Sequence, residues 1–135
     1  MKQKNNRHQA RLYAFQNLYA LEFHEGATRI QFPEGEVEEN LDKNYAQTLI
    51  EGVRSSLADI DAVIQAHSAK RKVERLAGVD RNILRMAIWE MTMSDEKLAP
   101  GIVINEAVTL AKEYAGENAY KFIHAVLDAV AKEQR

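Results

Sequence analysis

The chain has no cysteine among its 135 residues, only two prolines, and a single tryptophan. Without cysteine it can have no disulfide, no thiolate zinc site and no cysteine nucleophile. No apolar stretch approaches the roughly 20 residues of a membrane-spanning helix. The basic start is not followed by the apolar segment and cleavage site of a signal peptide. We therefore expect a cytoplasmic protein that does not enter a membrane.

The composition is that of an ordinary globular protein, with 46% hydrophobic and 28% charged residues. The net charge of −2 is unevenly distributed along the chain. The first 21 residues contain four basic residues and no acidic one, which leaves 14 basic and 20 acidic residues for the remainder. A basic start on an acidic body indicates two surfaces for different partners, one of them a polyanion such as nucleic acid. The plainer interpretation is that these basic residues only hydrate the terminus.

Apolar residues recur at spacings of three and four throughout the sequence, which is the period of amphipathic helices. The pattern predicts a helix over about residues 6–25, a loop over 26–39, and a second helix that Asp59 or Asp61 interrupts and caps into a third. A short turn and three or four further helices follow. We therefore predict an all-α fold of about seven helices in two packed antiparallel three-helix bundles. The domain would span residues 1–135, with helical halves at about 1–72 and 73–135.

The sequence offers little for catalysis. The histidines at positions 8, 24, 67 and 124 share no metal-ligand spacing, and His67 on an apolar face is typical of a core or boundary residue. No nucleophile motif and no phosphate-binding glycine loop is present. Adjacent carboxylates stand in polar segments where nothing would shift their pKa. We expect no enzymatic activity, no metal and no cofactor.

Three segments in register resemble the NusB family of transcription antitermination factors. The first is Arg7–Arg11, followed by a Leu-Tyr pair at positions 18 and 19. The second is VDRNILRMAIWEM, residues 79–91. The third, residues 100–128, contains an Ile-Asn-Glu-Ala box, a Tyr-Ala-Gly helix stop and a Lys-Phe-Ile terminal helix. The resemblance covers nearly the whole chain apart from the loop at 26–39.

The resemblance implies a fold and a function. Proteins of this family are all-α, with two three-helix bundles, and they carry out no reaction. They pair with NusE, which is also a ribosomal protein, and the heterodimer binds boxA-type single-stranded RNA. In the RNA polymerase elongation complex, with other Nus factors, it supports transcription of ribosomal RNA.

The resemblance also implies RNA-binding residues at both ends of the chain. Single-stranded RNA needs cations for its phosphates and flat faces for its bases. Arg7, His8 and Arg11 stand where the family places its basic RNA-contacting residues, and the same basic segment also offers Lys2 and Lys4. Asn118 and Phe122, at the start of the last helix, match family positions near the same RNA surface, so the two ends would form one track. The plain alternatives are a helix cap for Asn118 and core packing for Phe122.

Tyr19, Glu74 and Asp80 match positions that the family uses to bind its ribosomal-protein partner, and acidic groups suit a basic partner. Asp80 could also cap a helix.

Two departures from the family pattern are visible. His8 and Gln9 dilute the usual arginine run, and His124-Ala125 stands where the family usually has Asn-Gly. His124 could replace the asparagine as a donor or stack on a base.

Three alternatives stay open. The diluted arginines and His124-Ala125 would also fit a helical protein–protein interaction module with the same fold and little RNA binding. NusB-like domains also begin some ribosomal RNA cytosine methyltransferases, an interpretation that fails if the chain is complete, because no cofactor-binding domain follows Arg135. The free protein could cover an open apolar face by forming a homodimer.

Overall fold

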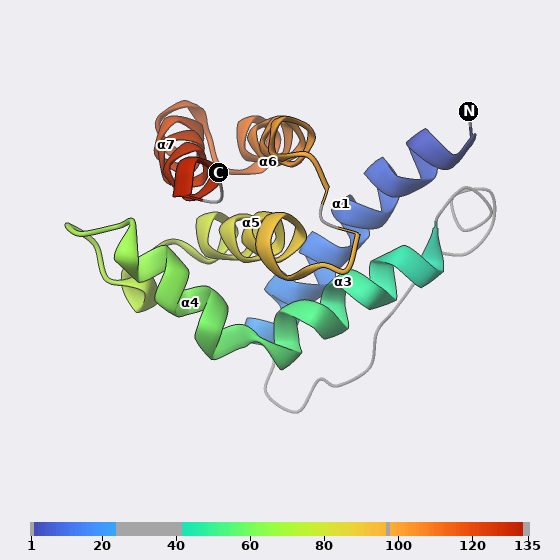
Figure 1. Ribbon diagram of the computed structural model, residues 1–135, viewed down its shortest axis with the longest axis horizontal. Helices are drawn as coiled ribbons and strands as arrows, with labels where there is room; N and C mark the ends of the chain where they lie inside the picture. The colour runs from blue at the N-terminus through green and yellow to red at the C-terminus, as the bar shows by residue number, and fades with distance from the viewer. Residues whose placement is uncertain (1, 24–41, 97, 134–135) are drawn as a thin grey trace. The chain divides into compact units, whose positions relative to one another are not determined.

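The computed structural model describes residues 2–23, 42–96 and 98–133, with the backbone alone for residues 2–6 and 23 (Figure 1). These residues form six α-helices, a 3₁₀ turn and a π-helical turn, and contain no strand, which confirms the predicted all-α fold. The elements are α1 (Lys2–Phe23), α3 (Lys43–Ser55), α4 (Leu57–Ala66), η1 (Val73–Arg75), α5 (Gly78–Ile88), η2 (Trp89–Met93), α6 (Pro100–Tyr114) and α7 (Glu117–Glu133). The predicted loop over 26–39 lies outside the described residues.

The chain divides into two compact units, residues 1–51 and residues 52–135. The first unit contains α1 and most of α3, and the second contains the end of α3 and all elements from α4 to α7. The predicted division into helical halves near residue 72 stays a prediction.

The first unit buries one apolar face from each of its helices. The side chains concerned are Ala10, Ala14, Phe15 and Leu18 of α1 and Tyr45, Ala46, Leu49 and Ile50 of α3. Helix α3 begins after Asp42, whose Oδ1 accepts a hydrogen bond from the backbone N–H of Tyr45 at 3.0 Å. This contact pairs one of the amide groups that a helix start leaves without a partner.

Helix α5 is the centre of the second unit. It packs against α4, α6 and α7, with α4 on one side and α6 and α7 on the other (Figure 1). The residues that periodicity directs inward here are all buried: Ile83, Leu84, Ala87 and Ile88 of α5, and Met91 of η2. Asp80, Arg81 and Asn82 of α5 are buried as well, because the helix contacts neighbours on several sides.

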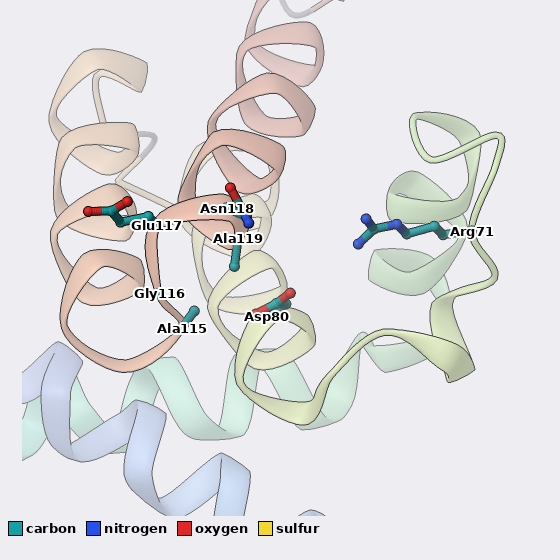
Figure 2. Close-up of a pocket in the computed structure, with 7 residues that line it drawn as sticks. All are labelled: Arg71, Asp80, Ala115, Gly116, Glu117, Asn118 and Ala119. Carbon is teal, nitrogen blue, oxygen red and sulfur yellow. The ribbon is translucent and has the colours of Figure 1, made fainter.

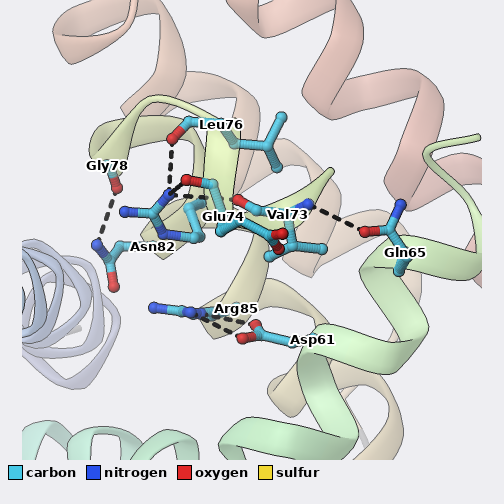
Figure 3. A network of polar contacts seen from close by, with 9 residues as sticks. Asp61, Gln65, Val73, Glu74, Leu76, Gly78, Asn82 and Arg85 are labelled. Carbon is cyan, nitrogen blue, oxygen red and sulfur yellow. Dashed lines mark hydrogen bonds and ion pairs between the residues drawn. The ribbon is translucent and has the colours of Figure 1, made fainter. Parts of the chain in front are cut away.

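Two arginines of α5 bind the segments around it, Arg85 through an ion pair and Arg81 through backbone carbonyls. Arg85 binds Asp61 of α4 through two hydrogen bonds of 2.8 Å, one from Nε and one from Nη2 (Figure 3). Arg81 is buried, and its Nη1 donates to the backbone carbonyls of Leu76 at 2.7 Å, Val73 at 3.3 Å and Glu74 at 3.4 Å. The guanidinium of Arg81 therefore pairs carbonyls of η1 and of Leu76, the residue that follows it.

The structure corrects three predicted helix boundaries. The break between α3 and α4 falls at Ser56, before Asp59 and Asp61, and Asp61 pairs with Arg85 instead. Helix α5 begins at Gly78 with Ala77 as its N-cap, so Asp80 lies inside the first turn. Likewise α7 begins at Glu117, directly after Gly116, so Asn118 is not the cap residue. Capping propensity identified the neighbourhood of each helix start but missed the residue by two to five positions.

Candidate nucleic-acid interface

A pocket of about 370 Å³ lies at the start of α7. It is lined by Arg71, Asp80 and the five residues from Ala115 to Ala119 (Figure 2). The turn from α6 into α7 depends on Gly116, whose φ of 92° is strained for any residue with a Cβ. This turn brings exposed Asn118 beside the first turn of α5, where Asp80 stands. Two residues predicted for different roles, RNA binding and partner binding, therefore share one pocket.

Arg71 connects this pocket to Phe122. Its guanidinium carbon lies 4.6 Å from the centre of the Phe122 ring, a cation–π contact. Figure 2 shows the Arg71 side chain reaching from the segment after α4 toward the start of α7. Phe122 itself is half-buried. Part of the Phe122 ring is therefore packed in the core, and part is at the surface in contact with the Arg71 guanidinium.

Asp80 is a carboxylate in a largely buried position, with 8% of its surface exposed. Burial raises the pKa of its carboxyl above the usual range, and the positive charge of Arg71 opposes part of that rise. The other two predicted partner contacts are accessible. Glu74 is exposed and 39% of Tyr19 is exposed. Tyr19 also packs in a tilted arrangement on Phe15, with ring centres 6.3 Å apart.

The predicted cations of α1 differ in access. Arg7 is half-buried and lies over the Tyr45 ring, with its guanidinium carbon 4.1 Å from the ring centre. Arg11 is 5% exposed and lies 5.7 Å from the same centre. His8 is half-buried, and the side chains of Lys2 and Lys4 lie outside the described residues. The burial of Arg11 favours a packing role for that guanidinium, so its contact with RNA has the least support of the set.

The structure brings some predicted residues together and leaves others in separate units. Asn118 and Asp80 line one pocket, Phe122 is joined to it through Arg71, and exposed His124 lies farther along α7. The α1 residues belong to the first unit, so the predicted track shared with α7 stays a prediction. Sequence reasoning gave no role to Arg71. The signal was present in the Lys70-Arg71-Lys72 run, but its position beside Phe122 depends on the fold.

The parts of the chain that the structure describes offer no metal site and no membrane span. No group of three or more histidine, aspartate or glutamate side chains among them could hold a metal ion. None of the described helices is long and apolar enough to cross a bilayer.

Comparison with known proteins gives matches along nearly the full length. The profile of the NusB family matches residues 8–132. The chain is 42% identical over 129 residues to transcription antitermination protein NusB of Bdellovibrio bacteriovorus, covering 93% of this chain and 95% of that one. For the protein of the same name from Thermodesulfovibrio yellowstonii, the identity is 36% over 141 residues, with 95% and 93% covered.

Two solved structures have the same fold. T. maritima NusB superposes with a TM-score of 0.76 at 36% identity, covering 94% of this chain and 91% of that chain. A crystal structure of antitermination factors NusB and NusE in complex with dsRNA contains a chain that superposes with a TM-score of 0.72 at 32% identity. That match covers 95% of this chain and 97% of the other.

Proposed function

Because this chain belongs to the NusB family of transcription antitermination proteins, we propose that it binds boxA-type single-stranded RNA together with ribosomal protein NusE. In this role it supports transcription of ribosomal RNA, within the RNA polymerase elongation complex and alongside other Nus factors. A relative of 32% identity has been crystallised with NusE and dsRNA, which supports NusE and an RNA as partners. The protein would act in the cytoplasm by binding alone, without catalysis, metal or cofactor.

The observation that carries the RNA-binding proposal is the arrangement at the start of α7. A guanidinium lies over the half-buried ring of Phe122, and exposed Asn118 stands in the adjoining pocket. RNA recognition uses stacking on aromatic rings and guanidinium planes, with amide groups to hydrogen-bond the base edges. His124, exposed on the same helix, would contribute a second flat, polar ring.

The N-terminal cations would supply the phosphate contacts. Arg7 and His8 are partly accessible on α1, and Lys2 and Lys4 precede them in the same helix. Charge on several side chains near the RNA backbone raises affinity at low salt without reading sequence.

The partner surface would use Tyr19, Glu74 and Asp80. Exposed aromatic side chains commonly anchor protein interfaces, and acidic groups attract a basic ribosomal protein at long range. Tyr19 and Glu74 are accessible for such contacts. Asp80 lies beside Asn118 in the pocket, so partner binding and RNA binding would influence each other there. Without its partner, the free protein would form a homodimer.

An electrophoretic shift assay with labelled boxA-type RNA tests the proposal. The assay compares this protein alone, NusE alone and the two together over a range of salt concentrations. We expect tight binding only with both proteins, and weaker binding of a scrambled RNA of the same length. Equal binding of the two RNAs, or no gain from NusE, would contradict the proposal.

The burial of Arg11 favours a second candidate, a protein–protein interaction module with little RNA binding. It removes one expected cation from an N-terminal segment that His8 and Gln9 already dilute. His124-Ala125 stands where the family usually has Asn-Gly, so α7 also lacks two of the residues expected on its RNA-binding side. A pull-down in which this protein recovers NusE while the complex leaves the RNA unbound would favour the module.

A further inference from the structure

We propose that the segment Lys70–Lys72, called the basic loop below, is a second phosphate-binding element for the RNA. It would hold the backbone of the strand while a base stacks near Phe122. This inference rests on the proposed function and extends it to residues that the family resemblance does not assign.

The backbone of the basic loop is held by two side chains that precede it, Gln65 of α4 and Ser68. Gln65 Nε2 donates to the carbonyl of Arg71 at 2.9 Å and to that of Ser68 at 3.2 Å. Gln65 Oε1 accepts from the N–H of Val73 at 3.0 Å (Figure 3), and Ser68 Oγ donates to the Arg71 carbonyl at 3.2 Å. One amide therefore fixes the chain on both sides of Lys72, so little backbone entropy is lost when a ligand binds.

The lysines of this loop are available to a ligand. Lys70 and Lys72 are exposed, and neither side chain makes an ion pair or hydrogen bond with another described residue. By contrast, the exposed Lys132 pairs with Asp128 at 3.2 Å. Two unpaired ammonium groups on either side of a guanidinium form a strong local positive field, which attracts phosphate groups.

Arg71 places this charge beside an aromatic face. Its guanidinium covers the Phe122 ring, so the loop and the start of α7 form one surface. Asp80 and Glu117 stand on the pocket side of Arg71 and would repel a phosphate there. The strand's phosphates would therefore lie toward Lys70 and Lys72. Its bases would lie toward the ring and the pocket, where carboxylates accept hydrogen bonds from base amino groups.

This combination points to RNA more than to an acidic protein segment. An acidic peptide would pair with the lysines, but its carboxylates could not stack on the Phe122 ring or the Arg71 guanidinium. A single-stranded nucleic acid carries phosphates and planar bases at a regular spacing, so it matches both halves of the surface. The loop would also compensate for α1, where Arg11 is buried.

The test compares two double variants in the complex with NusE, with labelled boxA-type RNA as probe. Lys70→Gln/Lys72→Gln removes two charges from the loop, and Arg54→Gln/Lys132→Gln removes two exposed charges elsewhere in the chain. On single strands each phosphate contact contributes about 0.7 to the slope of log K against log salt. The loop variant should therefore lose about 1.4 of the slope and bind boxA and scrambled RNA more weakly by the same factor. The control should keep the wild-type slope.

Further measurements separate the outcomes. Lys70→Arg/Lys72→Arg keeps the charge and should retain the slope. Melting curves of both loop variants should coincide with wild type because their side chains are exposed, and the control should differ only by its lost surface ion pair. If wild type binds RNA and the loop variant matches it in affinity and slope, the inference fails and the proposed function stands. If the wild-type complex binds no RNA, both fail. A loop variant that loses affinity for NusE while its RNA slope stays unchanged would make this a protein-binding surface and overturn the inference.

Discussion

Gly52 of α3 lies so close to Trp89 that a Cβ at Gly52 would stand 2.2 Å from Cε2 of the indole ring. Trp89 is buried and opens the π-helical turn η2, in which the N–H of Ser94 bonds to the Trp89 carbonyl at 2.9 Å. The missing side chain at position 52 is therefore what allows the indole to occupy its site. The contact joins two elements more than thirty positions apart in the sequence.

Gly52→Ala should lower the free energy of unfolding by about 1–3 kcal/mol, the usual cost of forcing extra atoms into a packed site. Urea unfolding followed by circular dichroism measures the loss. Gly101→Ala is the matched control, because nothing lies within 4 Å of its would-be Cβ and it also sits in a helix. That control should be neutral or gain up to about 1 kcal/mol. Trp89→Phe should recover part of the loss in the Gly52→Ala background. Equal stability of the two alanine variants would mean that the indole moves aside easily.

Asp61→Asn should destabilise the second unit, because it breaks the two-bond pair between α4 and α5 and leaves Arg85 without that carboxylate. The pair is partly buried, with side chains 12% and 29% exposed, so we expect a loss of about 1–2 kcal/mol. Lys132→Gln removes an exposed pair of α7 and should cost less than about 0.5 kcal/mol. A double-mutant cycle over Asp61 and Arg85 measures the coupling. Strict additivity would show that the pair contributes nothing.

Asp80→Asn should change how stability depends on pH. Burial raises the pKa of this carboxyl in the folded protein, so the folded state takes up the proton more readily than the unfolded state. The free energy of unfolding of wild type therefore falls as the pH rises from about 3.8, the pKa of this carboxyl in the unfolded chain, to its higher pKa in the folded protein. Above the folded pKa the loss stays constant. The variant should be more stable than wild type at neutral pH, and its advantage should shrink in acid. Melting curves of both proteins across this pH range test the prediction. If the stability advantage of the variant grows in acid, burial does not raise the pKa of Asp80.

The cations of α1 should separate into two classes. Lys2→Gln/Lys4→Gln/Arg7→Gln should reduce the salt slope of RNA binding by about 2, at roughly 0.7 per lost phosphate contact on single strands. Arg11→Gln should leave the slope unchanged and lower stability by about 1 kcal/mol, since its guanidinium is buried near the Tyr45 ring. Shift assays with NusE and boxA-type RNA, together with melting curves, measure both. A slope that falls for Arg11→Gln would show that this side chain reaches the RNA.

Helix positions and their buried faces follow from the sequence because they depend on local spacing. The inward residues of α5 and the stop at Gly116 needed only a period near 3.6 and the conformational freedom of glycine. Where local spacing was the only guide, single side chains were misjudged. The spacing of the apolar residues predicts that Tyr114 is buried on the inner face of α6, but 43% of its surface is exposed. The helix starts were misplaced as well, because Ser56 and Ala77 precede α4 and α5 without any side-chain capping bond.

The contacts that build the candidate interface depend on segments far apart in the chain. The position of Asp80 next to Asn118 follows from how α5 and α7 pack, and that of Arg71 over Phe122 from where the segment between α4 and η1 lies against α7. Periodicity and family resemblance were enough to identify an all-α protein with basic and aromatic groups at its two ends. Folding decided which cation faces which ring and which arginine is buried, because solvation and Coulomb energies depend on distances in space.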